Sequence, residues 1–79
     1  MKARFTEGIT RTLLAKQCFD EVRMWPGCET IMGVAVLRDG ADRFQVKVTA
    51  YGAAGKRLAD RAIGCVEREK LRYYHLVDG

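Results

Sequence analysis

The sequence has no serine and only one histidine, one proline and three cysteines, and each shortage excludes a kind of chemistry. Without serine, the chain has no serine nucleophile for a catalytic triad. The histidine, His75, lies near the C-terminus, where no spaced set of ligands accompanies it, and we expect it at the surface. A cysteine nucleophile would need His75 brought to Cys28 or Cys65, which no local pattern suggests. We therefore predict a protein that is not an enzyme, with no catalytic residue, no bound metal and no cofactor.

The three cysteines, Cys18, Cys28 and Cys65, are odd in number, and no two of them are spaced as a CxxC pair. This pattern argues against a disulfide framework and against a zinc site. Cys18 and Cys65 fall on or beside apolar helix faces, where cysteine behaves as a small hydrophobic residue. Cys28 falls in a loop, and it is the cysteine that we expect to be exposed.

Long apolar runs are also missing. None approaches the roughly 20 residues of a membrane-spanning helix, and the first residues lack the apolar middle of a signal peptide. The apolar fraction of 48% is ordinary for a globular chain, and the length suits a single small domain over residues 1–79. We expect a soluble, cytoplasmic protein that does not contact a membrane.

The strongest pattern is an amphipathic helix over residues 52–74. Wound at about 100° per residue, this stretch gathers its apolar residues on one side, which we expect to face the core. These residues are Ala59, Ala62, Ile63, Val66 and Tyr73, with Leu58 and Cys65 at the borders. The opposite side carries Arg57, Arg61, Arg68 and Arg72, with Gly64 in the gap between the two pairs.

We refer to Arg57, Arg61, Arg68 and Arg72 as the arginine ridge. Like charges four residues apart destabilise a helix by about 0.2–0.5 kcal/mol per pair. A helix face kept only for solubility would more often alternate in sign. A solvated face is the ordinary interpretation of such a run, and the ridge is also a candidate contact for an anionic partner. Lys56, just before the ridge, is a further candidate for anion or nucleic-acid binding.

A second helix is expected in the N-terminal part, capped by Thr6 or Thr10 and running to about Met24. Pro26 ends it, because the residue before a proline disfavours helical geometry. Its apolar face consists of Leu14, Ala15, Cys18, Phe19 and Val22.

Several residues around this helix are harder to place. Ile9 and Leu13 lie on its other side, without a partner in a single small domain. Residues 1–6 fit either a short strand or a frayed tail. Trp25 is expected to cover the core at the end of the helix.

Between the helices, residues 30–38 and 43–51 are predicted to form a hairpin with a turn at 39–42. The second strand alternates cleanly, whereas the first is apolar on both faces, so two registers are open. A two-residue turn places Leu37 opposite Phe44, which directs Ile31, Ala35 and Leu37 to the core. A one-residue bulge at Gly40 exchanges this set for the other one. That other set is Met32, Val34 and Val36.

The order helix, strand, strand, helix predicts an α+β fold of αββα type, with both helices on one face of a small antiparallel sheet. A two-stranded sheet is marginal alone, and a chain this short has little core. We therefore expect a homodimer in which edge strands pair into a four-stranded sheet. The row Met32, Val34 and Val36 is the candidate self-contact. The corresponding function is a small binding or assembly module that self-associates.

The run from Phe44 to Leu71 resembles the end of a double-stranded RNA-binding domain. In that family a strand, a glycine-containing loop and a helix that opens with two basic residues follow in this order. The resemblance covers about a third of the chain and implies binding of duplex RNA through Lys56, Arg57 and the basic face. The family's pattern has a third basic residue where this chain has Asp60, and three strands between its helices where we expect two.

A second resemblance is carried by the residues Trp25-Pro26-Gly27-Cys28-Glu29, which join a helix to a hairpin. In this respect the chain is similar to small bacterial proteins of unknown function that have a PGCE-like element. That resemblance implies no activity. An acidic protein surface is a further candidate partner for the basic face.

Overall fold

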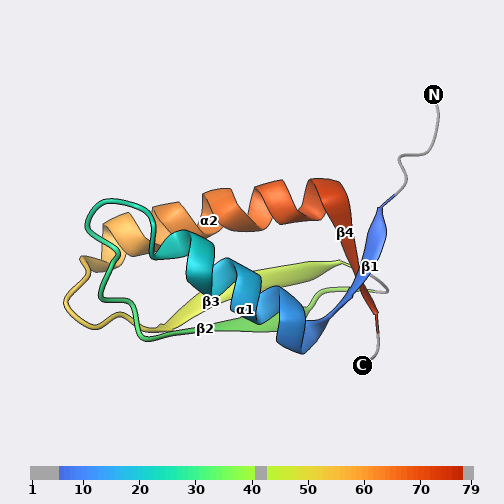
Figure 1. Cartoon of the computed structure of the whole chain (residues 1–79), viewed down its shortest axis with the longest axis horizontal. Coiled ribbons are helices and arrows are strands. Elements are labelled where there is room, and N and C mark those ends of the chain that lie inside the picture. Colours follow the sequence, from blue (N-terminus) through green and yellow to red (C-terminus); the bar gives the residue numbers. More distant parts are fainter. Residues whose placement is uncertain (1–5, 41–42, 78–79) are drawn as a thin grey trace.

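The computed structural model describes residues 6–40 and 43–77. In chain order, its elements are β1 (Glu7–Thr10), α1 (Arg11–Val22), β2 (Gly33–Arg38), β3 (Phe44–Ala50), α2 (Lys56–Tyr73) and β4 (Tyr74–Val77). The strands β2 and β3 form an antiparallel hairpin, and β1 and β4 form a separate parallel pair. The chain is thus a small α+β domain, as the sequence predicts (Figure 1).

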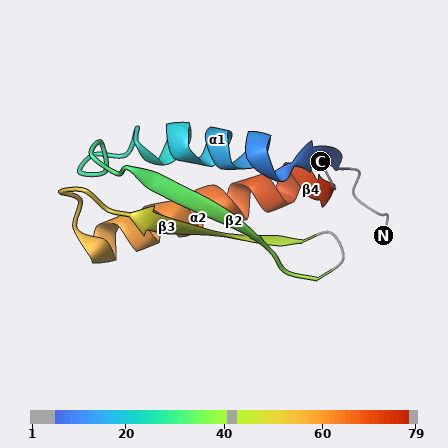
Figure 2. The ribbon, with the colours of Figure 1, turned by 90° about the horizontal axis from the view of Figure 1, so that it is seen from below.

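The two helices run antiparallel along the hairpin (Figures 1 and 2). Helix α1 contacts β2, α2 contacts β3, and the helices also contact each other. The β1–β4 pair lies at the end where α1 begins and α2 ends. The residues that form the core are Ile9, Leu14, Cys18, Val22, Cys28, Ile31, Val36, Phe44, Val46, Val48, Ala59, Ala62, Ile63, Val66 and Leu76.

The β1–β4 pair was not predicted, and it supplies the cover that Ile9 lacked. Ile9 pairs with Leu76 of β4, and both side chains are buried. Thr10 is the N-cap of α1, because its hydroxyl oxygen accepts a hydrogen bond from the backbone N–H of Leu13 at 3.3 Å. Leu13 itself is exposed. Residues 1–5, which belong to the predicted tail or strand, lie outside the described residues.

The hairpin has the shifted register, so the alternative with Ile31, Ala35 and Leu37 as the core face is wrong for two of the three. Val36 pairs with Val46, whereas Leu37 pairs with Gln45 on the outer face. Next to β2, Gly40 has φ 93°, and the Asp39 N–H donates to the Arg43 carbonyl at 2.9 Å. Ile31 is still buried, since it precedes β2 and a register irregularity separates Gly33 from Val34.

The same register corrects the predicted self-contact row. Val36 is 4% exposed and belongs to the core, and Val34 is half-buried against it. Met32 alone of the three is largely exposed, at 74%. The row is therefore not a continuous outer surface.

The turn before α2 depends on Gly52. Its φ is 62°, and a Cβ atom there would lie 2.0 Å from the carbonyl oxygen of Thr30. The Thr30 hydroxyl also accepts a hydrogen bond from the N–H of Ala53 at 3.1 Å. These contacts fix the start of α2, which begins at Lys56 rather than at residue 52.

Candidate nucleic-acid interface

The arginine ridge runs along the side of α2 that faces away from the core. Ala59, Ala62, Ile63 and Val66 are buried, as predicted, and they fix the rotation of the helix. All four ridge arginines are exposed as a result. Among residues 6–40 and 43–77, none forms an ion pair with them. Within the part of the chain that the structure describes, the ridge is therefore a row of cationic side chains without an acidic partner.

Lys56 lies beside the ridge but has partners of its own. Its ammonium is 3.0 Å from Asp60 Oδ2 and 5.6 Å from the centre of the Tyr51 ring. The Tyr51 hydroxyl donates to Asp60 Oδ1 at 2.6 Å. Hydrogen bonds from Tyr51 and Lys56 lower the pKa of Asp60, and the bond to Asp60 raises the pKa of Lys56.

These contacts bear on Asp60, the acidic residue at a position where the double-stranded RNA-binding family has a basic one. Tyr51 and Lys56 hold its carboxylate on the β3 side of α2. The ridge lies on a different side of the helix, which faces away from the core. Asp60 therefore neutralises Lys56 rather than the ridge. The four-residue spacing of Lys56 and Asp60 is visible in the sequence, but the contact of Tyr51 with Asp60 depends on the turn that precedes α2.

Lys70 is a buried residue of α2 that the pattern missed. It is buried, and its ammonium donates to Glu21 Oε2 at 2.5 Å and to Gln17 Oε1 at 3.2 Å, both on α1. Its ammonium also lies 5.7 Å from the centre of the Tyr74 ring. Position 70 lies seven residues after Ile63, on the predicted apolar side, so spacing alone could have placed it. Tyr73, predicted on that side, is exposed instead because the helix ends there.

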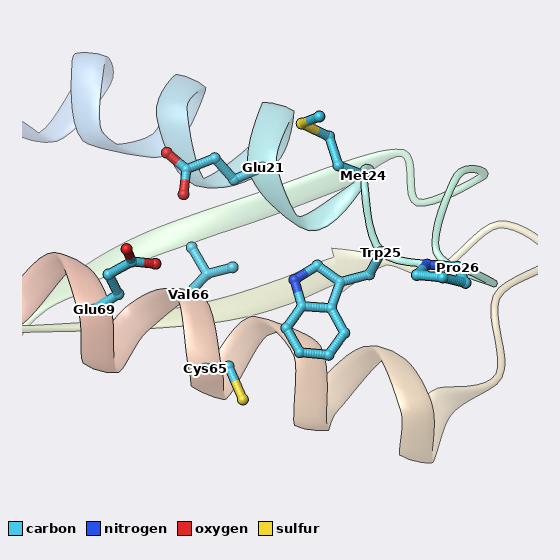
Figure 3. A pocket seen from close by; sticks show the side chains of 7 residues that line it. All are labelled: Glu21, Met24, Trp25, Pro26, Cys65, Val66 and Glu69. Atoms are coloured by element: carbon cyan, nitrogen blue, oxygen red, sulfur yellow. The ribbon is translucent and has the colours of Figure 1, made fainter.

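A hollow of about 420 Å³ lies between the end of α1 and the middle of α2 (Figure 3). Its lining residues are Glu21, Met24, Trp25, Pro26, Cys65, Val66 and Glu69. Trp25 is half-buried and packs on the core, as predicted, so its indole forms one wall (Figure 3). One of the two carboxylates, on Glu21, is already bound to Lys70. The hollow has room for an apolar side chain but holds no constellation typical of catalysis.

Cys18 and Cys28 are buried, and His75 has a side-chain hydrogen-bond partner. Cys28, expected to be exposed, is buried, as is Cys18, whose pKa burial raises to about 11. Burial also raises the pKa of Cys28. His75 lies in β4, with Nδ1 2.8 Å from the hydroxyl of Thr6, so it ties the two ends of the described chain together. No cluster of three or more potential metal ligands occurs among the described residues.

No protein-family model, no curated protein and no solved structure matches the chain. Within the described ranges, neither helix combines the length and hydrophobicity needed to cross a membrane. Among the described residues, the arginine ridge is the most distinctive group of exposed side chains.

Proposed function

We propose that this chain is a small non-enzymatic binding module that holds a nucleic acid by its phosphates, through Arg57, Arg61, Arg68 and Arg72. The observation that carries the proposal is the ridge: four exposed guanidinium groups on one side of α2, without an acidic partner among the described residues. The positive charge that a phosphate backbone would neutralise is thus already gathered on one rigid element.

The chemistry of the ridge favours phosphates. A guanidinium presents a planar fork of donors that matches a phosphate group, and it is charged at all physiological pH values. From Arg57 to Arg72 the helix rises by about 22 Å, at about 1.5 Å per residue, which is long enough for several phosphates. No aromatic residue interrupts the ridge, so stacking on unpaired bases has no support there. The expected mode is contact with the backbone.

Charge reversal should test this directly. We expect Arg57→Glu/Arg61→Glu and Arg68→Glu/Arg72→Glu each to weaken binding of a 20-base-pair duplex about tenfold or more near 50 mM salt, with a shallower dependence of log Kd on log salt. Fluorescence anisotropy over a salt series measures both quantities. Arg11→Glu/Arg43→Glu is the matched control, since it changes the net charge equally at exposed residues away from the ridge.

Two results would contradict the proposal. One is an absence of binding to duplex and single-stranded nucleic acid at low salt. The other is an equal loss in the control, which would mean that only net charge matters. A partner captured in a pulldown that persists after nuclease treatment, and that the ridge variants lose, would instead indicate an acidic protein surface.

Self-association is a second candidate, favoured by the open edge of β2. Within the described residues β2 pairs with β3 alone, and Leu37 on its outer face is 46% exposed. An unpaired, apolar edge strand is a template for another strand, and two copies pairing there would form a four-stranded sheet.

The molar mass of the protein in solution tests this candidate. We expect light scattering at tens of micromolar to give twice the 8.9 kDa of the chain. Ala35→Lys/Leu37→Lys should return the mass to that of one chain, because charges on an edge strand oppose pairing. A single-chain mass before any substitution would exclude the dimer.

A further inference from the structure

Gly64 occupies an interior position of α2 for which the fold gives no reason. A Cβ atom at this position would meet nothing within 4 Å, unlike one at Gly52, which would collide with Thr30. The backbone there is helical and needs no unusual torsion angle. Glycine is nevertheless less favourable than alanine inside a helix, because its unfolded chain has more freedom to lose. The chain thus tolerates a destabilising residue at a site where alanine would fit.

Gly64, which destabilises the helix relative to alanine, lies in the middle of the arginine ridge. It lies between Arg57 and Arg61 on one side and Arg68 and Arg72 on the other. It also lines a groove of about 270 Å³ between α2 and β3. Without a side chain at this position, the middle of the ridge is a gap where another molecule can reach the helix backbone. We refer to this gap at Gly64 as the glycine gap.

We infer that the nucleic acid is a duplex lying across α2 at the glycine gap, with one arginine pair on each backbone strand. The inference rests on the proposed function and adds to it the kind of nucleic acid and a contact point that carries no charge. The midpoints of the two arginine pairs are about 16 Å apart along the helix, at about 1.5 Å per residue. A duplex groove is about 12 Å wide in B-form DNA, and arginine side chains can cover the difference.

A groove explains why the gap contains no side chain. A helix that bridges the two backbone strands places its middle over the groove. A Cβ atom or a larger side chain at position 64 would hold the helix away from the phosphates at both edges of the groove. A-form RNA presents a wide, shallow minor groove, and B-form DNA a wide major groove, so both duplexes offer the required shape. A single strand offers no second rim, and the ridge has no aromatic residue on which its bases could stack.

The decisive variant is Gly64→Ala, because its effects on folding and on binding should have opposite signs. We expect it to raise the midpoint of thermal unfolding by about 3–6 °C, through the better helix propensity of alanine. We also expect it to weaken duplex binding about fivefold, and Gly64→Gln to weaken it further. Thr12→Ala is the control, since it improves helix propensity at an exposed position of α1 and should leave binding unchanged.

Anisotropy titrations with duplex RNA, duplex DNA and a single strand of equal length separate the outcomes. Tighter binding of either duplex than of the single strand, with the loss in Gly64→Ala confined to duplexes, supports the inference and identifies the groove. If Gly64→Ala is more stable but binds duplexes as before, while the ridge reversals weaken binding, the inference is wrong and the proposed function stands. Equal binding and equal loss for the single strand would also overturn it. If the ridge reversals change nothing, the proposed function itself fails.

Discussion

Val36→Lys should unfold the chain, whereas Leu37→Lys, one residue further along β2, should leave it folded. Val36 is 4% exposed and faces Val46 in the core, and Leu37 is 46% exposed on the outer face. A lysine at position 36 would bury an ammonium group without a partner, at a cost of about 4 kcal/mol or more. The whole stability of a 79-residue domain is only about 4–12 kcal/mol. At position 37 the ammonium reaches water, and the cost should stay below about 1 kcal/mol.

Far-UV circular dichroism and urea unfolding of the two variants measure the difference. The pair is a matched control for itself, since both substitutions remove a branched aliphatic residue from the same strand and add the same charge. A folded Val36→Lys together with an unfolded Leu37→Lys would mean that the hairpin has the register of a two-residue turn. The stabilities of the two variants thus decide between the two hairpin registers that the sequence alone leaves open.

That ambiguity has a physical cause. Strand side chains alternate between two faces, so a shift by one residue exchanges every inward side chain of β2 for an outward one. The second strand has one apolar and one polar face, and its inward residues Phe44, Val46 and Val48 could be predicted. The first strand is apolar on both faces, so its pattern carries no preference. Gly40, which has a positive φ next to β2, leaves only a weak signal for the register in the sequence.

The helix α2 could be predicted more fully because its pattern extends over 18 residues. The burial of Ala59, Ala62, Ile63 and Val66 follows from their spacing, and the exposure of the ridge follows from the burial of the opposite side. The β1–β4 pair could not be found in this way. Each strand has four residues and joins its helix without an intervening loop, so the period of two never becomes visible.

The most consequential residue that the pattern missed is Lys70, and removing its partner Glu21 should lower the free energy of unfolding. We expect Glu21→Ala to lower the free energy of unfolding by about 2–4 kcal/mol, because the Lys70 ammonium would stay buried with only Gln17 and the Tyr74 ring beside it. Lys70→Met should cost less. The Lys70 side chain is 10% exposed and that of Glu21 is 41% exposed, so an unpaired Glu21 can regain water while an unpaired Lys70 cannot.

Urea unfolding of Glu21→Gln, Lys70→Met and Glu21→Gln/Lys70→Met gives a matched double-mutant cycle, in which Glu21→Gln, like Glu21→Ala, leaves the Lys70 ammonium without a carboxylate partner. The double variant should lie within about 1 kcal/mol of the original chain, because a buried ion pair replaced by neutral groups of similar size is often no less stable. Equal losses in the two single variants would contradict the asymmetry, and a double variant that loses their sum would show that the ion pair is not the source of the effect. If the asymmetry is observed, the pair serves to fix α1 against α2, and with it the direction in which the arginine ridge faces.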